Sequence, residues 1–363
     1  MELLNDLAGF QAAFGAQDMS SEAMKRAVGN WFSLYYDRED LMQLPYTIVR
    51  KLCRSVFAEC ALEGLENWPA AAALELALIG GECYLKPVQV DGVWQWRPIP
   101  RGSILVFGRD WFGEPTDVGL MERTLRGRFC YTLLERRKLG PDGLLTVTNR
   151  LFRSANRKEL GREVKLSDQP LYADLPERYT YPVELGGVGL VRLRMPVANC
   201  VDGSREGVSI YAAAMPLLKA IAENEEQLQG EFRRGQSRLV VSRDMLRGGQ
   251  LTDELFVGLD ESPETVGITI FAPQLREASF LARQQAYLRS LEHIIGLKRG
   301  LLSQVEAEDR TATEITSSEG EYMTLIWELR RAVETAAQAC AGLLDALDGG
   351  SRQVSLDWGD GVV

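Results

Sequence analysis

Helical periodicity dominates the first 80 residues of the chain. Ser20-Ser21-Glu22 is typical of a helix start, and apolar residues then recur every three or four positions from Met24 to Tyr35. A second helix is predicted from about Pro45 to Ala61. A third, alanine-rich helix is predicted from Pro69 to Ile79, where Gly80-Gly81 ends it. The N-terminal part is therefore predicted to be helical.

From residue 82 the pattern alternates between apolar and polar positions, as it does in half-buried strands. Two alternating runs flank Asp91-Gly92, a pair that accepts the positive φ angles of a tight hairpin turn. Ile104 to Phe107 predicts another short strand. A second hairpin is predicted around Pro141-Asp142-Gly143, between strands at 129–138 and 144–152. Together these segments predict an antiparallel meander.

The last 155 or so residues return to long helical patterns (by the residue numbering). A helix is predicted over 208–234, with either a kink near Pro216 or a start near residue 215. Short strands follow within 235–275, then a returning helix over about 273–295. A charged loop leads to a final helix over 313–348, which Gly349-Gly350 ends. The fold class predicted from these patterns is α+β.

Charge is distributed unevenly. The 363 residues carry a net charge of −10, which argues against a protein that coats nucleic acid by overall positive charge. Residues 121–165 nevertheless hold twelve Lys or Arg against five Asp or Glu. Two interpretations stay open for this segment: solvated outer faces of strands, or a basic face for an acidic neighbour or nucleic acid.

The sequence offers few chemical groups for catalysis. His293 is the one histidine, and the six cysteines form no CxxC pair, which disfavours zinc sites, redox motifs and a histidine-based triad. Gly-x-x-x-x-Gly-Lys-Ser/Thr and Gly-x-Ser-x-Gly do not occur. We therefore predict no catalytic residues, no metal and no cofactor. No signal peptide or membrane-spanning segment is expected.

Several short segments, in order, are similar to those of a known family. Asn149-Arg150-Leu151-Phe152-Arg153-Ser154 and Gly161 to Leu166 precede Pro196-Val197-Ala198-Asn199, then Gly207-Val208-Ser209-Ile210-Tyr211, and finally Arg310-Thr311-Ala312-Thr313-Glu314-Ile315. With the helix, small β insertion and returning helix, this order resembles the portal (head-to-tail connector) protein of tailed double-stranded DNA bacteriophages of the long-tailed type. The resemblance covers roughly residues 25 to 348.

The resemblance implies an architecture of wing, stem, clip and crown. The wing would comprise residues 1–207 and the long helix 313–348. The remaining parts would be stem helices at 208–234 and 276–296, a clip at 235–275, a tunnel loop at 297–312 and a tail at 349–363. Because that tail is short, the crown of other family members is expected to be short or absent.

The resemblance also implies a function and partners. The chain would form a ring of about twelve copies, a closed cyclic assembly, at one vertex of the capsid. Double-stranded DNA would pass through its channel during packaging and ejection. The major capsid protein, the terminase large subunit and a head-completion adaptor would bind it, with a scaffold protein as a further candidate. The implied location is the virion, with assembly in the host cytoplasm and no membrane partner.

Three sets of residues are hypotheses for the sites of such a protein. The tunnel-loop set that would contact DNA is Lys298, Arg299, Glu306, Asp309 and Arg310. The stem-lumen set is Glu223 and Glu226, whose negative charge would repel phosphate so that DNA slides. The clip set for terminase or adaptor contacts is Arg243, Arg247, Asp253 and Glu254.

Two other classes of protein remain alternatives. One is an oligomeric phage adaptor or baseplate protein without a channel, which subunit count and a central hole would distinguish. The other is an enzyme without a sequence motif, such as a carboxylate-based hydrolase, for which no clustered acidic pocket is visible in the sequence.

Overall fold

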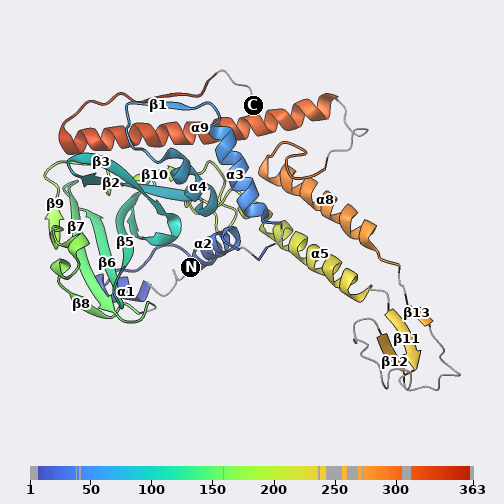
Figure 1. Cartoon of the computed structure of the whole chain (residues 1–363). Coiled ribbons are helices and arrows are strands. Elements are labelled where there is room, and N and C mark those ends of the chain that lie inside the picture. The colour runs from blue at the N-terminus through green and yellow to red at the C-terminus, as the bar shows by residue number, and fades with distance from the viewer. Residues whose placement is uncertain are drawn as a thin grey trace. The chain divides into compact units, whose positions relative to one another are not determined.

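The chain divides into two compact units, each described here by itself. The computed structural model describes residues 7–37, 39–40, 42–157, 159–235, 238–242, 256–259, 269–271, 274–304 and 312–359. Unit 1 comprises Met1–Ala213 with Gly320–Val363, and unit 2 comprises Ala214–Glu319. Helices and largely antiparallel sheets occur together (Figure 1), so the predicted α+β class is confirmed.

The N-terminal helices of unit 1 follow the predicted pattern with one correction. They are α1 Leu7–Phe14, α2 Glu22–Tyr35, α3 Leu44–Val56 and α4 Ala70–Gly80. Ser21 caps α2 as predicted, because its side chain accepts a hydrogen bond from the Met24 backbone N–H at 3.1 Å. The prediction that α3 extends to Ala61 is wrong. Ala61 instead begins a strand whose partner lies near the C-terminus, which no local pattern could indicate.

That strand ties the C-terminal tail to unit 1. β1 Ala61–Glu63 pairs antiparallel with β14 Ser355–Asp357. The tail also packs its Trp358 ring against Phe57, with ring centroids 6.1 Å apart, and the Arg330 guanidinium lies over Trp358. The described residues 349–359 thus form part of unit 1 rather than a separate domain.

Two sheets follow α4 in unit 1. The first has strand order β10-β2-β3, with bounds Glu82–Val90 for β2, Val93–Pro100 for β3 and Val191–Arg194 for β10. The second has order β4-β5-β6-β7-β8, and β9 also pairs with β7. Its bounds are β4 Ile104–Arg109, β5 Pro115–Arg126, β6 Phe129–Leu139, β7 Leu145–Ser154, β8 Arg162–Val164 and β9 Arg178–Thr180.

The turns between these strands confirm the predicted meander. Asp91 and Gly92 adopt φ angles of 51° and 79°, as the tight turn between β2 and β3 requires. β6 and β7 pair across 140–144, which is the predicted second hairpin. Short 3₁₀ helices connect other segments, at Arg101–Ser103, Leu166–Asp168, Pro170–Tyr172 and Ala212–Ala214.

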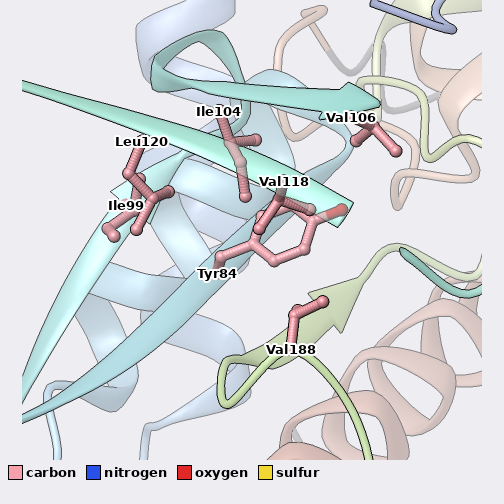
Figure 2. Close-up of a cluster of buried hydrophobic side chains, with 7 residues drawn as sticks. All are labelled: Tyr84, Ile99, Ile104, Val106, Val118, Leu120 and Val188. Carbon is pink, nitrogen blue, oxygen red and sulfur yellow. The ribbon is translucent and has the colours of Figure 1, made fainter. Parts of the chain in front are cut away.

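A shared apolar cluster joins the two sheets. Figure 2 shows its buried side chains, which come from β2, β3, β4, β5 and the segment before β10: Tyr84, Ile99, Ile104, Val106, Val118, Leu120 and Val188. Each is at most 9% exposed, so the cluster removes most of their apolar surface from water. The two sheets therefore share one core and position each other.

The described residues of unit 2 form an antiparallel helix pair, a small sheet, a loop and the start of the last helix. Its elements are α5 Met215–Arg234, β11 Arg238–Ser242, β12 Phe256–Leu259, β13 Thr269–Phe271 and α8 Glu277–Ile295. α5 begins at Met215 with Pro216 in its first turn, which confirms the start near residue 215 and excludes the helix predicted at 208–214. α8 begins at Glu277, later than the predicted 273 or 276. β11 pairs with β12 in parallel and with β13 antiparallel.

The last helix continues from unit 2 into unit 1. α9 spans Ala312–Asp348, one residue earlier than predicted at its start. It ends as predicted, where Gly349 adopts a φ of 74° and its N–H donates to the Asp345 carbonyl. None of the helices in the described residues combines the length and apolar composition needed to cross a bilayer.

The cysteines are free thiols with very different exposure. Four are buried, namely Cys53, Cys83, Cys130 and Cys340, while Cys60 is partly exposed and Cys200 is exposed. Burial raises the pKa of Cys53 and of Cys83 to about 12, which leaves little thiolate at neutral pH.

We expect a maleimide at pH 7 to modify Cys200 first and the four buried thiols at least about a hundredfold more slowly. Mass spectrometry of timed samples, before and after denaturation, measures this order. Equal rates for Cys200 and Cys83 in the folded protein would contradict it.

A buried carboxylate in the second sheet makes unit 1 less stable at acidic pH. Burial alone would raise the pKa of Glu135, but Arg137 and Lys86 outweigh it and hold the pKa at about 2. Because this value lies below that of an unfolded glutamate, the stabilisation is full above about pH 4.5 and is lost as the pH falls towards 2. We expect a loss of about 2–3 kcal/mol across that window, measured by urea unfolding at stepped pH. Glu135→Gln should remove this part of the pH dependence, and an unchanged slope would contradict the assignment.

Candidate functional site

The helix pair of unit 2 carries the predicted stem-lumen residues, and the predicted tunnel-loop residues follow its second helix. α5 and α8 pack side by side (Figure 1). The buried apolar positions recur at helical spacing on both helices, with Leu218, Ile221 and Leu228 on α5 and Leu288, Leu291 and Ile295 on α8. The opposite faces are exposed.

Polar side chains fix the register of this pair. The Asn224 side chain, 1% exposed, donates to the Phe280 carbonyl at 3.2 Å and accepts from Arg283 Nε at 2.6 Å. Arg283 also donates to Gln227 at 2.7 Å. Glu231 pairs with Arg276 at 2.9 Å. Contacts near the end of α5 thus join the start of α8, so the two helices run antiparallel and cannot slide without breaking several hydrogen bonds.

The predicted stem-lumen residues lie on the exposed side of α5. Glu223 and Glu226 are both exposed, and Glu223 lies 3.8 Å from Lys219 one turn earlier. Glu225 and Glu231, which the sequence pattern did not distinguish from them, instead bond to Gln284 of α8 and to Arg276, the residue just before α8. The structure therefore separates two solvent-facing carboxylates from two that hold the helix pair together.

A buried glutamate organises the loop after α8. Gly296 ends the helix with a φ of 79°, and the Leu297 N–H donates back to the Glu292 carbonyl at 2.8 Å. The Glu292 side chain is 2% exposed. It accepts from the backbone N–H groups of Gly300 at 3.1 Å, Leu302 at 2.6 Å and Ser303 at 2.9 Å, and from the Ser303 hydroxyl at 2.8 Å. Residues 300–303 are thus wrapped around one carboxylate.

Glu292 was not among the predicted site residues, although its position in the helix indicates burial. Glu292 lies four residues after Leu288 and three before Ile295, which are both buried. Helical spacing therefore places it on the buried face rather than the wet one. A carboxylate in such a position needs internal hydrogen-bond partners. The apolar Ile294, by contrast, is 47% exposed.

The structure describes two of the predicted tunnel-loop residues, Lys298 and Arg299. Their contact with DNA stays a prediction. Lys298 pairs with Glu319 at 2.8 Å, so part of its positive charge is neutralised within unit 2. Arg299 is partly exposed. Glu306, Asp309 and Arg310 lie outside the described residues, as do all four clip residues, Arg243, Arg247, Asp253 and Glu254.

The basic segment 121–165 contains two groups of cations. Three arginines are engaged inside unit 1: Arg136 with Asp117 at 2.7 Å, Arg137 with Glu135 at 2.5 Å, and Arg150 with Glu163. The carboxylate partner of Arg136 explains why its pKa lies above the usual range. A second group, with Arg126, Arg128, Arg153 and Arg162, lies at one end of the second sheet. This second group forms a basic surface, and Lys138, Arg157 and Lys165 of the same segment are exposed outside both groups.

The described residues also bear on metal and acid–base chemistry. Among them, no three His, Cys, Asp or Glu side chains gather as ligands of one metal ion would. His293 is exposed in the last turn of α8. A buried charged network surrounds Glu82 in unit 1, where Arg101 and Arg192 bind the same carboxylate at 3.0 and 2.7 Å.

Two comparisons of the chain with known proteins found no match. No protein-family model matches the chain. No curated protein matches it either.

Proposed function

We propose that this chain is the portal protein of a tailed double-stranded DNA phage, a ring-forming connector through which DNA is packaged and ejected. The observation that carries the proposal is the chain order in unit 2. An antiparallel helix pair brackets a small sheet, and an anchored loop then leads into one long helix. The division of the chain at 213/214 and 319/320 supports the same partition into wing and stem with clip.

The small sheet supports an assembled state. β11, β12 and β13 are short, with five, four and three residues. A sheet of this size buries too little apolar surface for independent stability, so it gains from packing against neighbours. A closed ring supplies such neighbours for every copy. We propose that this clip is where the terminase large subunit and later the head-completion adaptor dock.

The exposed carboxylates of α5 support a channel role. In a ring, Glu223 and Glu226 of each copy would present repeated negative charge to the lumen, which disfavours phosphate binding and lets DNA slide. The anchored loop at 297–304, with Lys298 and Arg299, would contact DNA briefly as it passes. The capsid protein would hold the wing.

Charge reversal tests the channel role. We expect Glu223→Lys with Glu226→Lys to leave assembly intact and to reduce the number of DNA-filled heads at least about tenfold, because lysines in the lumen would bind phosphate. The assay supplies cognate terminase and capsid protein and counts filled heads by microscopy. The matched control reverses two exposed carboxylates of unit 1, Glu66→Lys and Glu177→Lys. Equal filling by both variants would argue against a lumen position for Glu223 and Glu226.

The alternative is an oligomeric phage adaptor or baseplate protein without a channel. It would use the same small sheet and helix pair for assembly, but would show no dependence of DNA passage on Glu223 and Glu226. The charge-reversal experiment therefore distinguishes the two functions.

A further inference from the structure

An aromatic turn projects from the second sheet of unit 1. Trp111 and Phe112 lie between β4 and β5 and are 92% and 72% exposed. Large aromatic side chains placed together on a surface are typical of binding hot spots rather than of free solvent-facing turns. We call this turn, residues 110–114, the aromatic tip.

The aromatic tip holds its shape without using the two rings. The Asp110 N–H donates to the Glu114 carbonyl at 2.9 Å, and the Gly113 N–H donates to the Asp110 carbonyl at 3.1 Å. The Asp110 side chain accepts from the Glu114 N–H at 2.8 Å. The rings are therefore presented by a closed, hydrogen-bonded turn.

Two arginine side chains stabilise the turn by donating hydrogen bonds to its backbone carbonyls. Arg109 donates to the Gly113 carbonyl at 2.9 Å, and Arg205 donates to the Phe112 carbonyl. Gly113 adopts a φ of 83°, which a side chain would strain. A rigid turn loses little conformational entropy when its aromatic residues become buried, so such a turn is well suited to docking.

The opposite end of the same sheet carries arginines. β5 has 12 residues from Pro115 to Arg126, so at roughly 3.3 Å per residue its two ends are about 36–40 Å apart. At the far end, Arg126 pairs in register with Phe129, and Arg153 of β7 with Arg162 of β8. We call Arg126, Arg128, Arg153 and Arg162 the arginine end.

Among the described residues, three of the four arginines in the arginine end have no carboxylate partner. Arg128 and Arg153 both lie over the Phe129 ring, at 5.0 and 4.8 Å from its centroid. In the described part of the chain, no carboxylate forms an ion pair with Arg128, Arg153 or Arg162. Like charges held this close repel one another, so a partner offering π faces or carboxylates would be bound favourably.

We propose that the aromatic tip of one copy docks on the arginine end of a second copy of this chain. Guanidinium groups stack on Trp and Phe faces, and the exposed Asp110 beside the rings supplies a carboxylate to the same arginines. The two surfaces lie at opposite ends of one sheet and are not alike, so the contact is head-to-tail and repeats from copy to copy. Closure into a ring rests on the proposed function, whereas the contact itself rests on unit 1.

Cross-linking between engineered cysteines tests this contact. The parent variant carries Cys60→Ser and Cys200→Ser, which remove the partly and fully exposed thiols. Glu114→Cys, in the aromatic tip, and Ala155→Cys, close to Arg153, are then added, singly and together, so that both aromatic rings and all four arginines stay in place, and the assembled protein is treated with a short bifunctional maleimide. We expect a ladder of covalent multimers only when one chain carries both cysteines. A mixture of the two single variants should give a dimer and nothing larger, because each chain keeps one reactive end.

The outcomes separate this contact from the proposed function. Adding Trp111→Ala to the double-cysteine variant should reduce the ladder by about tenfold or more, since it removes the most exposed ring of the contact. Rings that form without a ladder would overturn the contact and leave the portal proposal standing. A ladder without rings would support the contact and contradict the portal proposal. If duplex DNA is retarded on gels through Arg128 and Arg153 and no ladder forms, the arginine end binds nucleic acid and the contact is overturned.

Discussion

Glu82→Gln is expected to lower the free energy of unfolding of unit 1 by about 3–5 kcal/mol, the range for breaking a buried ion pair by removing one partner. Glu82 has no exposed surface. Its carboxylate binds Arg192 at 2.7 Å and Arg101 at 3.0 Å, and accepts from the Tyr84 hydroxyl at 3.1 Å. Burial would raise the pKa of Glu82, but Arg192 and Arg101 outweigh it and keep the pKa below its usual range.

The same network explains why replacing the Glu82 carboxylate with a neutral amide has such a large effect. Arg101 also binds Glu206 at 2.9 Å, and Glu206 binds Arg109 at 3.0 Å. With a neutral amide at position 82, Arg101 and Arg109 would share Glu206, and Arg192 would keep only the exposed Glu114 as a carboxylate partner. Water cannot solvate the excess positive charge, because Arg101 is only 5% exposed.

Tryptophan fluorescence during urea unfolding measures this loss for unit 1 alone, since all seven tryptophans lie within it. The matched control is Glu163→Gln, which breaks the Arg150 pair where the Glu163 side chain is 47% exposed. That control should cost less than about 1 kcal/mol. If both variants lost the same small amount, the buried network would not stabilise unit 1 as argued.

Glu292→Ala is expected to release the loop at 297–304 while leaving α8 folded. The variant removes one buried acceptor of four hydrogen bonds, three of them from backbone N–H groups. Hydrogen bonds to charged groups contribute about 1.5–3 kcal/mol each but are not additive, so we expect a loss of about 3–4 kcal/mol in local opening free energy. Amide hydrogen exchange at Gly300, Leu302 and Ser303 should therefore accelerate by about two orders of magnitude.

Ser290→Ala is the matched control for this loop. Ser290 lies on the same helix, is exposed, and donates its hydroxyl only within α8, to the Ala286 carbonyl. Its replacement should leave exchange in the loop unchanged. Unchanged exchange at Leu302 in Glu292→Ala would show that the loop holds its conformation by other contacts. Under the portal proposal, the released loop should also reduce the filling of heads with DNA.

Local signals could be read from the sequence where neighbouring residues decide the structure. Ser21 caps α2, Asp91-Gly92 turns the first hairpin, and Pro216 occupies the first turn of α5. Each of these depends on backbone geometry within a few residues. For the same reason, the α+β class and the order of the unit 2 elements could be predicted without a relative of known structure.

Features that join distant segments could not be predicted. Ala61 is a strand residue because of Asp357, and Glu82 depends on Arg192 and on the Gly207 backbone N–H. The candidate site shows the same limit. Exposure of Glu223 and Glu226 matches helical spacing, whereas the pairing of Lys298 with Glu319 depends on how the loop folds. The sequence did not predict a role for Trp111 and Phe112, because two adjacent aromatic residues are common. Only the structure shows that both are exposed.

The central claim is a ring with a channel, and the mass of the assembled protein tests it most directly. The chain should be produced together with its capsid and scaffold proteins, purified, and measured by light scattering, with electron microscopy of the same fraction. The account predicts a ring with a central hole and a mass near half a megadalton, roughly twelve copies of 40.5 kDa. A chain that remains a 40.5 kDa monomer with those partners present, or an assembly without a hole, would contradict it.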